Sequence, residues 1–260
     1  MDIKEFMGRP DEKPLEKLIE GGGFVSCFPT IAVIGDSLAS GELQINRPTG
    51  EHLYFDFYEY SWGHFIEKQT GSKVHIFARG GMTAKAYRDS FANLRGHWKR
   101  EYAANAYIIA LGVNDLLNHD TPLGGPEDVN REDYTKNADT YIGNYAYIIQ
   151  RYKQIQPGAK FFLLTIPQSS DRGESRREKT ERMREAIYTL ADMFEDTYVI
   201  DLYKYAPDFD ADFRQAFFLN GHMNPMGYRF ISMLVVSYMD YIMRHNAGEF
   251  KNIGLMGVDE

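Results

Sequence analysis

The chain of 260 residues carries 29 Lys and Arg side chains against 37 Asp and Glu side chains, a formal net charge of −8. This negative charge argues against nucleic acid or an anionic membrane surface as the main partner. The single cysteine, Cys27, excludes an internal disulfide and a thiolate metal cluster, and a buried free thiol is expected for it.

The length and the apolar content suit a single domain over residues 1–260, with residues 1–29 as an N-terminal extension that packs on it. No apolar run is long enough to cross a bilayer. The N-terminus is charged and lacks the pattern of a secretory signal, which favours the cytoplasm unless a leader has been removed.

Five apolar, β-branched or aromatic runs predict buried strands, at 30–35, 73–78, 106–111, 160–166 and 197–202. Segments of helical periodicity or composition lie between and after them, at 58–70, 83–100, 132–155, 175–194 and 225–246. This alternation is typical of a parallel sheet covered by helices on both faces. The sequence therefore predicts an α/β fold.

The remaining material falls in loops, at 38–57, 112–131, 167–175 and 203–224. Such loops at the carboxyl ends of strands form the binding site of a doubly wound sheet. One basic run, at 172–184, mixes Glu and Arg at helical spacings. It is interpreted as the solvated face of a helix.

The first candidate site residue is Ser37, in the Gly-Asp-Ser triplet that directly follows the first predicted strand. A serine at a strand-to-helix turn is exposed at the rim of the sheet, and the helix N-terminus favours developing negative charge. Taken alone, the triplet is better explained by Ser37 acting as a helix N-cap.

Two further stretches follow the second and third strands. In the first, a glycine pair, Gly80 and Gly81, precedes Thr83, which can begin a helix, and a glycine N–H can approach a ligand oxygen closely. In the second, Gly112 and Asn114 stand in the sequence Gly-Val-Asn-Asp. An asparagine amide there can donate to an oxyanion, although Asn-Asp is also common in turns.

The fourth stretch places His222 in a glycine-flanked loop just ahead of the last helix, whose start Asn224 and Pro225 indicate. A lone histidine is usually structural, and six others occur: His52, His64, His75, His97, His119 and His245. His222 differs because its loop returns toward the carboxyl edge of the sheet, where it can take a proton from Ser37.

Together the four stretches resemble the SGNH hydrolase superfamily, also called GDSL esterases and lipases, from about residue 30 to residue 246. The matching residues are Ser37, Gly81, Asn114 and His222. The resemblance implies a three-layer α/β/α sandwich with a central five-stranded parallel sheet, of flavodoxin-like topology. It also implies an esterase that needs no metal and no organic cofactor.

By this resemblance, Ser37 is the acylated nucleophile and His222 the general base. The oxyanion hole consists of the Ser37 N–H, the Gly81 N–H and the Asn114 side chain, with Gly80 as the alternative to Gly81. Asp36 and Gly112 support their blocks.

The sequence departs from the superfamily at Leu219, where an aspartate usually orients the histidine. Three explanations compete: a backbone carbonyl of Leu219 or a neighbour orients His222, a carboxylate such as Asp201 substitutes, or catalysis has been lost. The first is favoured because the other blocks are intact. Other candidate carboxylates are Asp208, Asp210 and Asp212, which are better explained as turn and helix caps, because their run lacks the glycine and glutamate of a calcium loop.

The substrate is suggested by an aromatic cluster after the first motif, formed by Tyr54, Phe55, Phe57, Tyr58 and Tyr60. These rings would suit sugars or acyl groups, but their spacing favours a place in the core. The expected substrate is a small-molecule or saccharide acyl ester, foremost a carbohydrate acetylester.

The alternatives are another acylhydrolase of the superfamily, namely a lipase, thioesterase or arylesterase, or a catalytically silent carbohydrate-binding domain. A flavodoxin-like nucleotide binder is disfavoured, since no phosphate-binding glycine motif follows the first strand. No nucleic acid and no membrane is expected as a partner, and the oligomeric state stays open.

Overall fold

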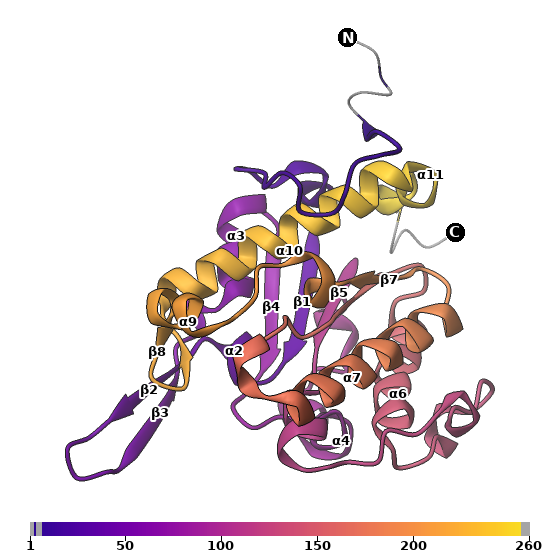
Figure 1. Cartoon of the computed structure of the whole chain (residues 1–260). Helices are drawn as coiled ribbons and strands as arrows, with labels where there is room; N and C mark the ends of the chain where they lie inside the picture. The colour runs from indigo at the N-terminus through magenta and orange to yellow at the C-terminus, as the bar shows by residue number, and fades with distance from the viewer. Residues whose placement is uncertain (1–2, 4–6, 256–260) are drawn as a thin grey trace.

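A five-stranded parallel sheet forms the centre of the computed structural model, which describes residue 3 and residues 7–255 (Figure 1). Its strands lie in the order β4-β1-β5-β6-β7. They are β1 (Thr30–Gly35), β4 (Lys73–Ala78), β5 (Ala106–Ala110), β6 (Lys160–Leu164) and β7 (Thr197–Ile200). These are the strands that the apolar runs predict, and the α/β fold is confirmed.

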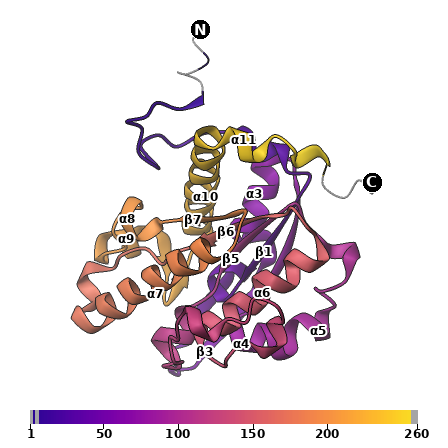
Figure 2. The ribbon, with the colours of Figure 1, turned by 90° about the vertical axis from the view of Figure 1, so that its right-hand side faces the viewer.

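Residues of each strand alternate between the two faces of this sheet, and both faces are buried. In β1, Ile31 and Val33 pack toward α3 (Trp62–Thr70) and α10 (Pro225–His245), while Ala32 and Ile34 face α6 (Tyr141–Ile155) and α7 (Glu174–Met193). Figures 1 and 2 show these helix pairs on opposite sides of the sheet. The result is the three-layer sandwich expected from the resemblance.

The helix predicted over 83–100 is broken in the structure. It consists of α4 (Ala84–Ala86), a π-turn (Tyr87–Phe91) and α5 (Ala92–Arg95), which ends where Gly96 adopts a φ of 71°. The helix predicted over 132–155 starts only at Tyr141, after Thr140 caps it by accepting from the Gly143 N–H. Periodicity thus found the helices, but not the local hydrogen bonds that end them.

The shorter elements lie mostly in the loops at the carboxyl ends of the strands. The helices are α2 (Ser37–Ser40), α8 (Leu202–Tyr205), α9 (Ala211–Phe217) and α11 (Ala247–Phe250), and the small strands are β8 (Phe218–Leu219) and β9 (His222–Met223). A π-turn spans Val113–Asn118, and 3-10 turns span Gly23–Cys27, Tyr58–Tyr60, Arg100–Tyr102, Pro126–Asp128, Tyr134–Lys136, Ser170–Arg172 and Ile253–Leu255.

A projecting antiparallel hairpin replaces most of the loop expected at 38–57. It pairs β2 (Glu42–Asn46) with β3 (His52–Asp56), and its turn is closed by the Gly50 N–H donating to the Arg47 carbonyl at 2.9 Å (Figure 1). It was missed because the sequence prediction assigned 38–57 to a loop and Tyr54 and Phe55 to the core, although Leu43 and Ile45 alternate with polar residues as in a strand.

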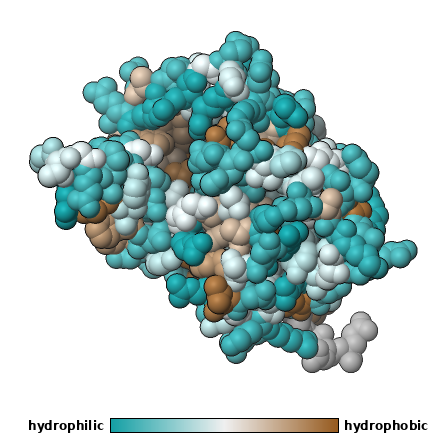
Figure 3. Space-filling view, turned by 90° about the horizontal axis from the view of Figure 1, so that it is seen from below, coloured by the Kyte–Doolittle hydropathy of each residue, from teal (hydrophilic) through white to brown (hydrophobic). Residues whose placement is uncertain are grey.

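The aromatic cluster, which lies on β3 and in the 3-10 turn after it, does not fill the core, so that interpretation was wrong. Tyr54, Phe55, Tyr58 and Tyr60 are 52%, 43%, 42% and 41% exposed. The hairpin is the lobe at the left of Figure 3, where apolar surface lies on the lobe and next to it. Cys27, expected to be buried, is exposed as well.

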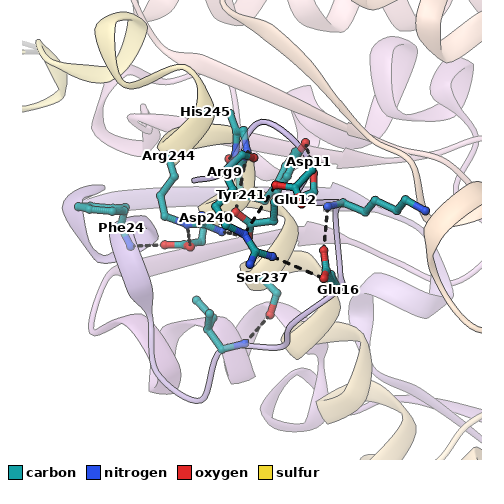
Figure 4. A network of polar contacts seen from close by, with 12 residues as sticks. Arg9, Asp11, Glu12, Glu16, Phe24, Ser237, Asp240, Tyr241, Arg244 and His245 are labelled. Atoms are coloured by element: carbon teal, nitrogen blue, oxygen red, sulfur yellow. Dashed lines mark hydrogen bonds and ion pairs between the residues drawn. The ribbon is translucent and has the colours of Figure 1, made fainter. Parts of the chain in front are cut away.

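The segment before β1 is held against the far end of α10 (Figure 4). Arg244 donates to both carboxylate oxygens of Glu12, at 2.7 and 2.8 Å, and to Asp240 at 2.8 Å. Asp240 also accepts from the Phe24 N–H at 2.8 Å. This network lies some five helical turns from the start of α10, roughly 30 Å from His222, so it anchors the chain rather than the candidate site.

Within residues 7–255, none of the helices combines the length and the hydropathy that a bilayer-spanning helix requires.

Candidate active site

Ser37 is the first residue of α2, immediately beyond the carboxyl end of β1. The N-cap of this helix is Asp36, whose carboxylate accepts a hydrogen bond from the Leu38 N–H at 3.0 Å. Ser37 is therefore not the cap that the isolated triplet suggested, and its side chain lines the main cavity. The capping role of the neighbouring aspartate leaves the serine hydroxyl available for chemistry.

Asp36 is buried, with 2% of its surface exposed. Burial, reinforced by the nearby carboxylate of Asp115, raises the pKa of Asp36 to about 7. Asp115 accepts from the Ala84 N–H at 3.0 Å, and its own burial raises its pKa to about 6. The floor of the site therefore holds carboxyl groups that resist ionisation.

The glycine pair after β4 has two different tasks. The N–H of Gly80 donates to Asp56, and a side chain at Gly80 would overlap the carboxylate of Glu42. Gly81 instead lines the cavity. Its backbone has a φ of 71°, a conformation that residues other than glycine rarely adopt. Thr83 caps α4, as predicted, by accepting from the Ala86 N–H at 3.0 Å.

Asn114 lies in the π-turn that follows β5 and is 8% exposed. Its amide nitrogen donates to the Met82 carbonyl at 3.1 Å and lies 3.4 Å from an oxygen of Asp36. Its amide oxygen accepts from the Asn118 side chain at 2.7 Å. These contacts fix the orientation of the amide, so that its nitrogen faces the residues that follow β1 and β4.

Gly112 makes this placement of Asn114 possible. Its φ is 133°, and a Cβ there would lie 2.6 Å from the sulfur of Met183 and 2.8 Å from the hydroxyl of Tyr141. Only glycine fits this position, which gives a physical basis to its role in supporting the block.

His222 lies in β9, and its ring is held by a carboxylate that the sequence did not single out. Its Nε2 is 2.9 Å from Oε1 of Glu42, and both side chains are largely buried, at 17% and 11% exposed. The Nδ1 atom is buried and has no hydrogen-bond partner among the described residues. The edge of the His222 ring also packs against Tyr54, with centroids 5.8 Å apart.

The two expected partners of His222 do not hold it. Leu219 pairs with His222 across the β8–β9 hairpin, but its carbonyl receives no hydrogen bond from the unpartnered Nδ1, and its side chain is 45% exposed. Asp201 is fully buried and accepts from Arg184 at 2.7 and 2.9 Å and from Tyr188 at 2.9 Å. Both expectations are corrected in favour of Glu42.

Glu42 was missed because it lies five residues after Ser37, on a strand that the sequence did not predict. Gly41, with a φ of 74°, ends α2 and turns the chain so that β2 passes beside the His222 loop. The Glu42 carbonyl accepts from the Tyr228 hydroxyl at 2.6 Å, which ties β2 to α10. The signal in the sequence was a carboxylate that follows a helix-ending glycine.

Of the other acidic candidates, Asp210 caps α9, as predicted, by accepting from the Phe213 N–H at 2.9 Å. Asp208 accepts from the Ser170 N–H at 3.0 Å and so joins the segment before α9 to the loop after β6. The capping role expected for Asp212 stays a prediction. In the described part of the chain, no group of three or more His, Cys, Asp or Glu side chains is arranged to hold a metal ion.

Ser37, Gly81, Asn114, Glu42 and His222 all line one cavity of about 520 Å³, and we call them the serine wall. No hydrogen bond joins Ser37 to His222 among the described residues, and such bonds are often loose without a substrate. Across the cavity lie the loop after β6, the start of α7 and α9. Their guanidinium groups form the arginine wall, namely Arg172, Arg176 and Arg214.

The arginine wall corrects the interpretation of the basic run at 172–184. Arg177 and Arg182 are exposed, as a solvated helix face requires, but Arg176 is half-buried and lines the cavity. Arg184 turns inward to the buried carboxylate of Asp201. Helical spacing did not reveal this difference, because the loop after β6 sets which face of α7 meets the cavity.

Residues 33–230 match the GDSL-like Lipase/Acylhydrolase family. The chain belongs to this family. It is a carboxylic ester hydrolase, as the resemblance implied. A comparison with curated proteins gives no match.

Solved structures of esterases share the fold of this family member. A carbohydrate esterase family 2 enzyme with a carbohydrate-binding domain, from Corynascus thermopiles (Myceliophthora fergusii), has 16% identity over 82% of this chain and 66% of its own, with a TM-score of 0.56. A family two carbohydrate esterase from Clostridium thermocellum, in complex with cellohexaose, has 14% identity over 85% and 65%, with a TM-score of 0.55.

A psychrotrophic esterase from Pseudoalteromonas has 13% identity over 83% of this chain and 98% of its own, with a TM-score of 0.53. The match thus spans nearly all of that esterase but only about two thirds of each carbohydrate esterase chain. At these identities the likeness concerns the fold.

Proposed function

We propose that the protein hydrolyses a short-chain acyl ester, foremost an acetyl ester of a carbohydrate, through an acyl-enzyme on Ser37. The observation that carries this proposal is the serine wall, where a free serine, a carboxylate-bound histidine and an asparagine amide meet in one cavity. Each of these groups supplies a different part of acyl transfer.

In the first half of the reaction, the Ser37 oxygen attacks the ester carbonyl while its proton passes to His222. The bond to the alcohol then breaks, and the alcohol leaves with that proton. In the second half, water attacks the acyl group and gives its proton to His222. The Ser37 oxygen regains a proton as the carboxylic acid leaves.

In this proposal the base is Nδ1 of His222, and the contact with Glu42 supports that choice. A carboxylate accepts a hydrogen bond only from a protonated nitrogen, so Nε2 carries the hydrogen. The lone pair then lies on Nδ1, the buried atom without a partner. Glu42 also stabilises the positive charge that His222 gains during the reaction, which is the usual task of the triad aspartate.

The oxyanion of the tetrahedral intermediate would be held by the Ser37 N–H, the Gly81 N–H and the Asn114 side chain. Gly81 is preferred to Gly80, whose N–H already donates to Asp56. The Asn114 amide is only 3.4 Å from Asp36, a long contact that can be exchanged for a shorter one with an oxyanion.

The proposal that the alcohol of the ester is a saccharide rests on an exposed aromatic side chain of the β2–β3 hairpin. Tyr54 is exposed and packs against the His222 ring, so a flat apolar surface stands directly beside the reacting groups. Two of the structural neighbours are named carbohydrate esterases, which agrees with a sugar ring at this surface. The contact between Glu42 and His222 supports the enzyme over a catalytically silent binding domain, because it supplies the carboxylate that Leu219 cannot.

The test is release of p-nitrophenol from p-nitrophenyl acetate by the wild type and by Ser37→Ala, together with labelling by a fluorophosphonate. We expect turnover and stoichiometric labelling of the wild type, and neither with the variant. Equal turnover by both proteins, or no labelling of the wild type, would overturn the proposal. Acetic acid release from acetylated oligosaccharides then identifies the preferred alcohol.

A further inference from the structure

Arg172 and Arg176 line the cavity, and their guanidinium groups lack partners among the described residues. In the part of the chain that the structure describes, neither side chain takes part in an ion pair or a hydrogen bond. Arg214 differs, since it donates to the Phe209 carbonyl and forms an ion pair with Asp171.

Arg176 is the more constrained of the two. It is half-buried, and its pKa lies below the ordinary arginine value because of burial and of the neighbouring Arg172 and Arg214. Asp171 pairs with Arg214 and also lies near Arg172, whereas the charged neighbours that act on Arg176 are the cations Arg172 and Arg214. An anion that binds beside Arg176 therefore gains free energy. The residues around the arginine wall therefore do not fully balance its positive charge.

The opposite side of the cavity carries the reverse charge. Glu42 belongs to the serine wall, and its carboxylate contacts His222. An anion would be repelled there and attracted to the arginine wall. The cavity thus imposes a direction on any charged substrate, with the ester at Ser37 and the anionic group away from it.

The sheet order gives the length of such a substrate. Ser37 follows β1, whereas the loop that carries Arg172 follows β6, two strands away. Neighbouring strands lie about 4.8 Å apart, so the two strand ends are roughly 10 Å apart. Because an arginine side chain reaches back over part of this distance, one ring between the ester and the anion is sufficient.

We propose that Arg172 and Arg176 bind a carboxylate or phosphate group on the part of the substrate remote from the scissile ester, so that the enzyme prefers anionic esters. The planar guanidinium fork matches the oxygens of either group. This inference rests on the proposed function for its substrate class, but the anion site itself can be tested without turnover.

The first measurement compares kcat/KM for phenyl acetate, para-carboxyphenyl acetate and para-acetoxyphenyl phosphate. The proteins are the wild type, the double variant R172Q/R176Q and the control R182Q, which removes an exposed charge from the same helix. We expect the double variant to lose about tenfold or more on one or both anionic esters and to keep its rate on phenyl acetate. The two anionic esters distinguish a carboxylate from a phosphate.

The second measurement is calorimetric binding of para-hydroxybenzoate, phenyl phosphate and phenol to the same three proteins. We expect the anions to bind the wild type and R182Q at least about tenfold more tightly than the double variant. The affinity for phenol should be the same for all three proteins. Equal anion binding by wild type and double variant would overturn the inference. If anions bind as expected but no ester is hydrolysed, the proposed function fails and the anion site stands.

Discussion

The two walls of the cavity differ in how their residues are held. On the serine wall, Asn114, Glu42 and His222 each contact other side chains of the site, and the backbone turns there depend on glycines such as Gly81 and Gly112. On the arginine wall, Arg172 and Arg176 have no partners among the described residues. Preorganised groups suit chemistry common to all substrates, whereas unpaired charges suit selection among substrates.

The largest expected effect on activity comes from removing the two proposed reacting groups of the serine wall. Ser37→Ala and His222→Ala should each lower kcat by about 10⁴-fold or more for neutral and anionic esters alike. The reason is that the proton transfer between them is common to every ester. Steady-state kinetics on phenyl acetate and para-carboxyphenyl acetate measure this, and circular dichroism checks that the fold is kept. A loss confined to one ester would contradict the division between the walls.

A second prediction concerns the carboxylate that replaces the missing aspartate. Glu42→Gln keeps the size of the side chain but removes the charge that stabilises the His222 cation, so kcat should fall by about 10- to 100-fold. KM should change little. The matched control is Glu51→Gln on the same hairpin, which removes only an exposed pair with Arg47 and should leave kcat unchanged. Equal rates for both variants would exclude Glu42 from the mechanism.

A third prediction is that ionisation of the buried Asp36 lowers the stability of the fold as the pH rises. The pKa of Asp36 is raised to about 7 from an ordinary value of 3.8, so between these values the folded state holds more protons than the unfolded state. The unfolding free energy should therefore decrease with rising pH in this window, by up to about 1.4 kcal/mol per pH unit.

Asp36→Asn tests this, because asparagine caps a helix as well as aspartate does. Urea unfolding at a series of pH values from 4 to 8 should show the variant gaining stability relative to the wild type as the pH rises. Parallel curves for the two proteins would mean that Asp36 does not titrate in this range.

The smallest predicted effect distinguishes the two arginines. Arg176 is half-buried and Arg172 exposed, and an ion pair weakens with exposure to solvent. R176Q should therefore lower kcat/KM on the preferred anionic ester about threefold more than R172Q, a difference of several tenths of a kcal/mol. Competition kinetics with both esters in one vessel resolve such a ratio. A larger effect of R172Q than of R176Q would mean that the anion lies nearer to the exposed Arg172.

Much of this molecule could be predicted from local patterns in the sequence. The apolar runs gave the parallel strands, because a strand buried on both faces must be apolar throughout. The motifs after β1, β4 and β5, together with the histidine ahead of α10, gave Ser37, Gly81, Asn114 and His222 as candidates. The structure brings all four to one cavity.

The contacts between distant segments could not be predicted in this way. The hairpin β2–β3 carries Glu42 to His222, and whether Asp201, Leu219 or Glu42 reaches that ring depends on how the loops fold over the sheet. The same holds for the half-buried Arg176, whose helical spacing equals that of its exposed neighbours.

Hydrophobic periodicity and short motifs in the sequence were sufficient to predict the strands, the helices on both faces of the sheet and a set of candidate site residues. Only the tertiary structure decided which carboxylate meets His222, which rings are exposed and which arginines face the cavity. These choices depend on packing between segments far apart in the chain, and no local pattern records them.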